Sequence, residues 1–454
     1  MNPNTVPADG LTSVDDQEYP RSGYAWYVVV VLLVIYILAY VDRQALGLLV
    51  EPVKRDLDLD DTQMSLLLGF AFAFFYTLVG LPMGRLADRT NRRNILLVGV
   101  IIWSIATAYC GMARNYVQLF LGRMGVGLGE ACLNPAVVPM LSDYFPRHRL
   151  GKAIGVYMLG ISIGGGLAHL VGGAYLPFLN STEHVIVPLI GAMRPWQSVL
   201  LGLGCAGFLA SLLVLTVREP SRKGVLSRND KGKIVNLPVR VIAAHIWRYK
   251  RAYLALVGPI VASATMSFGI GYWIPAFFQR SFGLSTVDAG TYLSYFGLAS
   301  MVVGAISVVG GGFLVDHLGL KYQDGHLRSL LTGLLLITPG FGLFALAPSP
   351  AWAIIALLPA LVGNGILQAS GVTALMAVVP PQMKSQIAAL NFFIINLVGA
   401  ALGPTLIALL TDQVFGDELM LRYSITAVAL SIGTLGVGLL LLGRSSYLTL
   451  QNAE

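Results

Sequence analysis

The sequence predicts an all-α polytopic membrane protein with twelve transmembrane helices in two pseudo-symmetric halves. Hydrophobic residues make up 56% of the 454 residues and charged residues only 12%, whereas soluble domains carry about 25% charged residues. Apolar runs of about 20 residues, each long enough to cross the hydrocarbon core of a bilayer, recur along the whole chain. Runs such as 27–40 and 425–442 are apolar on every side, unlike the short alternating strands of a β-barrel.

The first segment, residues 1–23, is a polar tail that contains Asp9, Asp15, Asp16 and Glu18. It lacks the basic start and cleavable apolar core of a signal peptide, so we expect the first helix to be retained. The predicted membrane helices then follow in order at 24–50, 62–84, 94–113, 115–142, 151–178, 196–217, 252–279, 286–312, 327–347, 350–379, 385–412 and 420–443.

A long hydrophilic segment divides the chain near its midpoint. We predict an N-terminal six-helix half at 24–217, a linker at 218–251, a C-terminal six-helix half at 252–443 and a C-terminal tail at 444–454. The later part of the linker, 239–249, mixes apolar and basic residues. This pattern suits either a short helix on an anionic membrane surface or a solvated tether.

Basic residues predict the orientation. If the amino terminus is cytoplasmic, 22 Lys and Arg residues fall on cytoplasmic segments and six on external ones. Such a bias decides topology under the positive-inside rule. We therefore expect both termini to face the cytoplasm, in a cell membrane that would be the inner membrane of a bacterium.

Two short patterns repeat between the halves. The interval from Gly84 to Asp88 recurs from Gly312 to Asp316, and the loop around Pro146 corresponds to the loop around Pro381. The two offsets are nearly equal, which indicates duplicated six-helix units in parallel register, an arrangement that permits alternating access to a site at mid-membrane.

The loop from Gly84 to Arg93 carries a specific motif. Its sequence, Gly-Arg-Leu-Ala-Asp-Arg-Thr-Asn-Arg-Arg, resembles the signature loop between the second and third helices of the major facilitator superfamily. The resemblance implies a conformational latch on the cytoplasmic side, made by Gly84, Asp88, Arg92 and Arg93. The alternative is a solvated basic loop that serves only as a topology signal.

Two further helices refine the resemblance. The fourth helix contains an Arg followed by small residues and an acid, from Arg123 to Glu130, and the first contains Tyr-Val-Asp-Arg at 40–43. Together they look most like the Spinster branch of the superfamily, whose members are linked to sphingolipid and lysophospholipid transport. Related organic-anion symporters carry similar first helices.

Four charges inside apolar helices need a reason: Asp42, Arg43, Arg123 and Glu130. A charge near mid-membrane costs at least about 2.5 kcal/mol on insertion scales. At 1.5 Å per residue, Asp42 and Arg123 are expected at similar depth. Glu130 lies two turns further on the same face of its helix as Arg123. We expect Asp42, Arg123 and Glu130 to line one wall of a polar cavity.

These charges suggest a coupling mechanism. We hypothesise that Glu130 and Asp42 exchange protons while Arg43 or Arg123 binds an anionic head group, because arginine stays charged and suits phosphate or carboxylate. The alternative is a static ion-pair network that holds the first helix against the fourth. Buried ion pairs are poor sources of net stability, which favours function.

The second half offers an apolar wall with scattered polar groups. Its central helices carry no charge near their middles, and a cavity charged on one side and apolar on the other suits an amphiphile. The candidate substrate contacts there are Tyr272, Trp273, Tyr295, Asn364 and Asn391. The leading hypothesis is a proton-coupled transporter of an amphipathic, lysolipid-like or sphingolipid-like anion, and the second is a proton-coupled symporter of a small organic acid.

Other classes fit the sequence poorly. It contains no HExxH, P-loop or paired cysteines, so we expect no enzyme activity, no metal and no cofactor. A channel would need a filter motif or rings of charge. The net charge of +7 is explained by cytoplasmic loops, so we expect no nucleic-acid partner. The resemblance favours a monomer whose partners are substrate, protons and the lipid bilayer.

Overall fold

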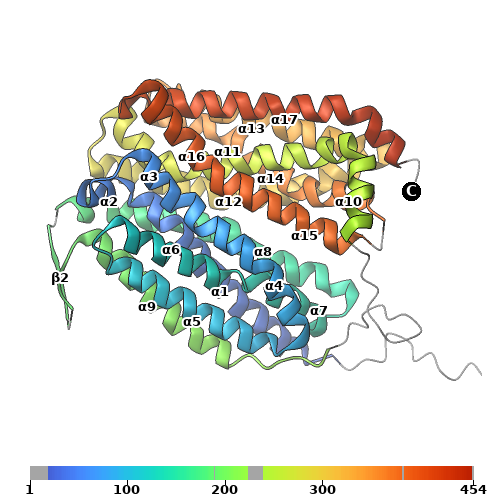
Figure 1. Ribbon diagram of the computed structural model, residues 1–454, viewed down its shortest axis with the longest axis horizontal. Coiled ribbons are helices and arrows are strands. Elements are labelled where there is room, and N and C mark those ends of the chain that lie inside the picture. The colour runs from blue at the N-terminus through green and yellow to red at the C-terminus, as the bar shows by residue number, and fades with distance from the viewer. Residues whose placement is uncertain (1–18, 182, 189, 223–238, 381–382, 452–454) are drawn as a thin grey trace, which may run out of the picture.

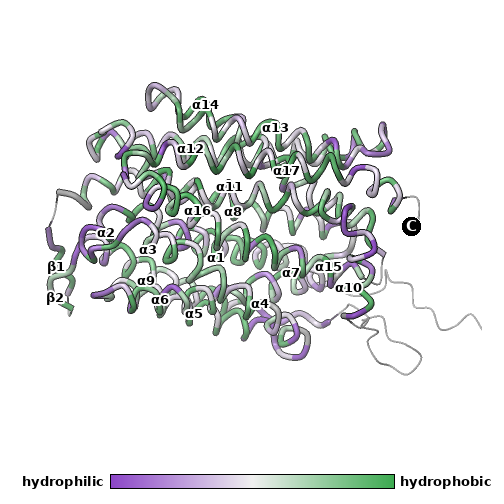
Figure 2. The backbone as a smooth tube through the Cα atoms, turned by 45° about the horizontal axis from the view of Figure 1, so that its top comes forward, coloured by the Kyte–Doolittle hydropathy of each residue, from purple (hydrophilic) through white to green (hydrophobic). Residues whose placement is uncertain are grey.

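A computed structural model describes residues 19–181, 183–188, 190–222, 239–380 and 383–451. The fold is all-α apart from one small hairpin, and twelve of its helical segments are long and apolar enough to cross a membrane. The predicted fold class is confirmed. These segments run roughly along one direction in Figure 1. Figure 2 shows their middles as mostly hydrophobic and the two ends of the bundle as richer in hydrophilic residues.

The first half supplies six membrane segments and one hairpin. Its elements are α1 Ser22–Leu48, α2 Val50–Leu57, α3 Asp61–Ser65, the π-helix η2 Leu66–Phe70, α4 Ala71–Arg89, α5 Arg92–Gly111, α6 Tyr116–Glu130, α7 Leu133–Tyr144, α8 Arg147–Ser181, β1 Val185–Val187, β2 Gly191–Met193 and α9 Pro195–Leu215. The antiparallel strands β1 and β2 pair with Ile186 opposite Ala192. The sequence had not predicted this hairpin.

The second half begins after the linker. Its elements are α10 Val239–Arg248, α11 Lys250–Phe282, α12 Thr286–Lys321, α13 Gly325–Ala345, α14 Pro350–Ala377, α15 Lys384–Ile394, the π-helix η3 Ile395–Leu402, α16 Gly403–Leu409, the π-helix η4 Leu410–Phe415, the 3₁₀-helix η5 Glu418–Met420 and α17 Leu421–Gln451. The helix α10 falls in the amphipathic stretch at 239–249, whereas linker residues 223–238 lie outside the described residues, as do 1–18 of the tail.

Several helices differ from the expected spans. The helices α8, α12 and α17 continue beyond 151–178, 286–312 and 420–443, because polar residues at the ends of an apolar span still extend the helix outside the hydrocarbon. The expected helix at 24–50 instead ends at Leu48, and a separate helix, α2, begins at Val50. Hydropathy indicates which residues can contact lipid, but it does not locate such breaks between helices.

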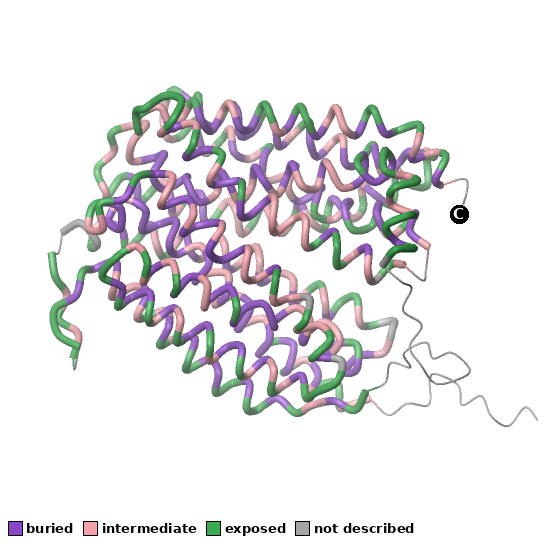
Figure 3. The backbone as a smooth tube through the Cα atoms, in the orientation of Figure 1, coloured by how far each residue is buried: buried purple, intermediate pink, exposed green. Residues whose placement is uncertain are grey.

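Buried residues lie where the helices face one another, and exposed residues lie on the outer sides of the helices (Figure 3). Many of the exposed residues are large and apolar. Leu209 is 63% exposed, Phe313 73% and Leu442 78%. Exposed apolar side chains on this scale are unusual in a soluble monomer. They are the expected surface of helices surrounded by lipid.

The two halves approach closely near the bundle end that carries α2, α3 and the hairpin, here called the α2 end. A Cβ atom built on Gly69 of η2 would lie only 2.6 Å from the carbonyl oxygen of Ala400 in η3. One built on Gly297 of α12 would lie 2.5 Å from the carbonyl oxygen of Gly166 in α8. Glycine at these positions lets backbones of the two halves touch.

Charged groups also join the halves at the α2 end. Arg280 of α11 donates to Asp61 of α3 at 2.6 Å and to Glu51 of α2 at 2.8 Å. Lys54 forms an ion pair with Asp61 and another, at 2.7 Å, with Glu418 of η5. Asp61 is fully buried, so its charge depends on these two cations. We call Glu51, Lys54, Asp61, Arg280 and Glu418 the α2-end ion network.

At the opposite end, which carries α7 and α10, charged clusters stay within each half. Arg92 donates to Asp143 at 2.6 Å and to Glu219, at the start of the linker, at 3.0 Å. Asp324, in the turn before α13, accepts from Arg328 and Arg444, each at 2.7 Å. Within the described residues, the ion pairs that join the halves all lie at the α2 end.

Asp324 also illustrates how such a cluster holds a turn. Burial disfavours its charged form, but the hydrogen bonds from Arg328 and Arg444 outweigh burial and keep the pKa of Asp324 below its ordinary value. The turn between α12 and α13 is thereby tied to α17.

Replacing Arg280 should destabilise this arrangement. The Arg280→Gln variant leaves Asp61 buried with only Lys54 as a partner, and breaking a buried pair from one side costs about 3–5 kcal/mol. We expect a clearly lower melting temperature for the purified protein in detergent. The control Arg55→Gln removes an arginine whose side chain is 66% exposed and should leave the melting temperature nearly unchanged. Equal melting temperatures for both variants would contradict a structural role for the network.

Candidate functional site

Four charged residues from two helices form a buried cluster in the middle of the first half. Asp42 and Arg43 lie near the end of α1, and Arg123 and Glu130 lie two turns apart on α6. Glu130 is fully buried and the other three are at most 7% exposed. All four lie within candidate membrane spans. Charges at such depth are rare and mark functional sites.

The strongest contact in the cluster joins α1 to α6. Arg43 donates through Nη2 to Oε2 of Glu130 at 2.5 Å. The same guanidinium stands over three aromatic rings, with its Cζ 4.5 Å from the centre of Phe72, 5.0 Å from Tyr40 and 5.2 Å from Tyr76. Ring faces attract cations, so the rings stabilise Arg43 where water is excluded.

Asp42 and Arg123 take other partners. Thr107 of α5 donates to Oδ2 of Asp42 at 2.7 Å. Arg123 donates through Nε to the carbonyl oxygen of Leu67 at 3.3 Å. Leu67 belongs to the π-helix η2, where the wider turn disturbs the α-helical hydrogen-bond ladder. Arg123 is therefore held by a backbone carbonyl, which does not neutralise its charge.

Each of the four residues keeps one buried polar atom without a partner. These atoms are Oδ1 of Asp42, Nε of Arg43, Nη2 of Arg123 and Oε1 of Glu130. Buried polar atoms are nearly always hydrogen-bonded in folded proteins. The cluster thus presents two acceptors and two donors that are open to further hydrogen bonds.

The pairing differs in detail from the expected wall of Asp42, Arg123 and Glu130. Glu130 forms its ion pair with Arg43, and Asp42 forms none within the described residues. Asp42 and Arg43 are adjacent on α1, so their side chains leave the helix about 100° apart. One consequently faces α5 and the other faces α6.

The second-half candidates occupy different surroundings. Tyr272 is buried and its ring packs against Gly47 of α1. Asn391 is buried and its Oδ1 has no partner. Asn364 accepts from Ser263 and Ser267 at 3.3 and 3.2 Å. These residues reach the interior of the bundle.

Trp273 and Tyr295 are placed less favourably for contact with substrate. Trp273 is fully buried and donates from Nε1 to the carbonyl oxygen of Pro404 at 3.1 Å, so its polar atom is already used. Tyr295 is 57% exposed on α12 and does not join the buried cluster.

The residues of the expected latch lie at the α10 end. Gly84 has open space where a side chain would project, and the side chain of Asp88 lies outside the described part of the structure. Arg92 binds Asp143 and Glu219. The backbone N–H of Arg93 donates to Glu219 at 2.9 Å. These contacts tie α5 to the ends of α7 and α9.

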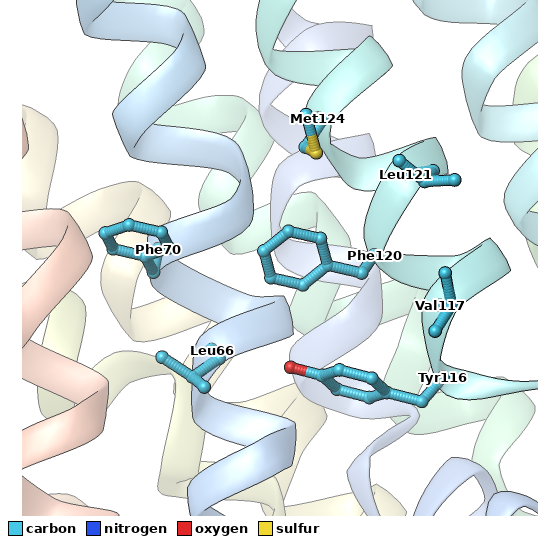
Figure 4. A pocket seen from close by; sticks show the side chains of 7 residues that line it. All are labelled: Leu66, Phe70, Tyr116, Val117, Phe120, Leu121 and Met124. Carbon is cyan, nitrogen blue, oxygen red and sulfur yellow. The ribbon is translucent and has the colours of Figure 1, made fainter.

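An apolar pocket of about 410 Å³ lies between η2 and α6 (Figure 4). It is lined by Leu66, Phe70, Tyr116, Val117, Phe120, Leu121 and Met124. Val117 and Leu121 are more than half exposed, so the pocket opens at the lipid-facing surface. Its lining carries no charge and suits hydrocarbon. The buried charges lie elsewhere, although Arg123 shares α6 with the pocket.

Several partners of the cluster were missed by reasoning from sequence. Phe72, Tyr76 and Thr107 look like ordinary packing residues, because aromatic and hydroxyl groups are common in membrane helices. A weak signal exists for Phe72 and Tyr76, which lie four residues apart and so share one face of α4.

Comparison with known proteins extends this description. The model of the Major Facilitator Superfamily matches residues 32–404. An MFS-type efflux pump of Mycolicibacterium smegmatis is 26% identical over 88% of this chain and 87% of its own length. Protein spinster of Drosophila melanogaster is 24% identical over 91% of this chain and 65% of its own length. A D-galactonate transporter of Escherichia coli is 26% identical over 69% of this chain and 73% of its own.

A solved structure agrees with the fold. A bacterial homologue of the human lysosomal transporter Spinster, in an inward-facing and unoccupied conformation, matches with a TM-score of 0.74 and 26% identity over 95% of this chain and 98% of that chain. The resemblance seen in the loop at 84–93 and in the two charged helices is thus confirmed. The chain belongs to the Major Facilitator Superfamily of membrane transporters, and within that superfamily it resembles members of the Spinster branch.

Proposed function

We propose that this transporter works by alternating access, coupled to protons, and moves an amphipathic anion such as a lysolipid or sphingolipid-like molecule. The observation that carries the proposal is the buried Arg43–Glu130 ion pair with unpartnered polar atoms around it. A carboxylate can release its arginine partner when it takes up a proton. The arginine is then available to an anion.

The arginines supply the proposed head-group site. Arg123 has a free Nη2 and Arg43 a free Nε, and a guanidinium remains charged at any physiological pH. A phosphate or carboxylate would accept both hydrogen bonds and replace the charge of Glu130. Neither arginine would then be left buried without a counter-ion, which is a costly state.

The carboxylates supply the proposed proton sites. Ionised Glu130 is paired to Arg43, and ionised Asp42 accepts from Thr107. Protonation of Glu130 would remove its charge and weaken its hold on Arg43 as substrate arrives. Substrate and proton would therefore act on the same arginine, which is the physical basis of coupling in this proposal.

The candidate residues of the second half favour an amphiphilic substrate. Tyr272 and Asn391 are buried and each carries a polar group, and sites that fix a mostly apolar ligand use few such groups. We assign a lesser role to Trp273 and Asn364, whose polar atoms have partners, and no substrate contact to the exposed Tyr295.

Orientation follows from charge. The α10 end carries Arg85, Arg89, Arg248, Lys250 and other basic residues, so we assign it to the cytoplasm and place both termini there. The α2 end, where the halves meet through the ion network, would then be the external end, closed in this structure. We propose that Gly84, Asp88, Arg92 and Arg93 act as a latch when the cytoplasmic end closes instead. We expect a monomer in the cell membrane.

A second candidate is proton-coupled symport of a small organic acid. It is favoured by the Escherichia coli relative, named as a transporter of D-galactonate, a sugar acid. The same arginines would bind its carboxylate. The two candidates differ in what the remainder of the site must accept, hydroxyl groups or hydrocarbon.

Removing the proposed proton site should uncouple transport from pH. In proteoliposomes, we expect Glu130→Gln to lose the acceleration that an imposed pH gradient gives the wild-type protein, because glutamine cannot take up or release a proton. The measurement is uptake or exchange with and without the gradient. Glu183→Gln, at an exposed loop position, is the matched control and should keep the response. Normal transport by Glu130→Gln with an unchanged pH response would show that the proton role is wrong.

Removing an arginine should weaken substrate binding. Arg123→Gln should raise KM by roughly 10- to 100-fold, because a hydrogen bond to a charged group contributes about 1.5–3 kcal/mol. Arg123→Lys, which retains the charge but not the planar fork, should show a smaller rise. Arg114→Gln, at an exposed position just before α6, is the control. An unchanged KM in Arg123→Gln would place the head group elsewhere.

A ligand panel should separate the two substrate classes. Ligands that bind the native state raise its stability, by about 2.7 kcal/mol at one hundred times Kd. We expect lysophospholipids to raise the melting temperature of the wild-type protein and not of Arg123→Gln, whereas D-galactonate should leave both unchanged. An Arg123-dependent shift with D-galactonate alone would favour the organic-acid candidate.

A further inference from the structure

The helix α10 and the first turn of α11 form a basic surface that the transport mechanism does not use. Four cations lie there, Arg240, Arg248, Lys250 and Arg251, and all four are exposed. The chain contains no Asp or Glu between residues 231 and 287. Within the described residues none of the four cations forms an ion pair. No carboxylate in the described part of the chain therefore compensates their charge.

The helix lies across the end of the bundle. Figure 1 shows α10 running across the direction of the membrane-spanning helices, at the end of the bundle where α15 and the C-terminus also lie. It is followed almost directly by the membrane helix α11, so it lies at the level where the hydrocarbon begins. A helix in this position runs in the plane of the lipid head groups.

One face of α10 is attached to the protein. Ile242 is buried, and the ring of His245 packs against Tyr249 at 5.2 Å and Tyr253 at 5.9 Å between ring centres. These residues recur at helical spacing and hold α10 against α11. The opposite face is consequently fixed in orientation and turned away from the bundle.

The outward face combines an aromatic anchor with the cations. Trp247 is 73% exposed and Val241 43%, and the ammonium of Lys250 lies 4.5 Å from the centre of the Trp247 ring. Tryptophan is enriched at membrane–water interfaces, where its apolar ring and N–H group are both accommodated. An exposed tryptophan beside unpaired cations is the composition of a surface that meets charged lipids.

We propose that α10 and the start of α11 form a binding surface for anionic phospholipid head groups, with Trp247 inserted at the interface and Arg240, Arg248, Lys250 and Arg251 contacting phosphates. The occupant is the bilayer surrounding the protein, and the argument is charge complementarity. The surface anchors the beginning of the second half to the membrane. The proposal does not depend on which substrate is carried.

The test uses the fluorescence of Trp247 in the full chain. The wild-type protein and Trp247→Phe are reconstituted into nanodiscs of phosphatidylcholine and phosphatidylglycerol, with bromine placed near the carbonyl group on one lipid or on the other. The difference in emission between the two proteins isolates Trp247 from the other five tryptophans. We expect brominated phosphatidylglycerol to quench this emission at least about twofold more strongly than brominated phosphatidylcholine does. The reason is that each cation near an anionic surface enriches anionic lipids roughly fivefold.

A charge variant separates the cations from the aromatic anchor. In Arg240→Gln/Arg248→Gln, we expect Trp247 still to be quenched by lipid but with a clearly weaker preference for phosphatidylglycerol, because only Lys250 and Arg251 remain. The control Arg55→Gln/Arg194→Gln removes two exposed arginines at the α2 end and should keep the preference. Equal quenching by both brominated lipids in the wild-type protein would overturn the proposal. So would quenching by aqueous iodide but by neither lipid, since the face would then be open to water or to a soluble partner.

Discussion

The organisation of this molecule depends on burying an ion pair within the span of its membrane helices. Arg43 and Glu130 would each be expensive alone in that position, and each is tolerated because the other is 2.5 Å away. The requirement brings α1 against α6 and turns Phe72 and Tyr76 toward the guanidinium. In the proposed mechanism, a proton or an anion that satisfies one partner of the pair would release the other.

The fold was largely predictable from sequence because the helices are surrounded by lipid. In lipid every backbone group must be bonded within its own segment, so an apolar run such as 196–217 predicts a helix with little ambiguity. The breaks were not predictable. Nothing in composition distinguishes Leu49, where α1 gives way to α2, from its neighbours, and the π-helices η2 and η3 read as continuous helix.

Sequence identified the residues of the candidate site but did not predict which of them contact each other. Asp42, Arg43, Arg123 and Glu130 stand out because charges are rare in apolar runs. Their pairing depends on how α1 and α6 are rotated about their axes, and a rotation of one residue exchanges Asp42 for Arg43 at the interface. The members of the α2-end ion network were not predictable. Lys54, Asp61 and Arg280 lie outside apolar runs or at their edges, where charges are common. From the sequence, the two cations therefore served only as markers of topology.

The π-helices have a consequence for how two rigid halves can slide on each other. A π turn holds one more residue than an α turn, and moving it along a helix rotates each residue that it passes by about 100° with little loss of backbone hydrogen bonding. In this structure η2 and η3 face each other across a close backbone approach between the halves, at Gly69 and Ala400. The contact between the halves thus contains two helical segments that can rotate relative to each other as a π turn moves. The side chains that meet at this contact can then be exchanged without unfolding either helix.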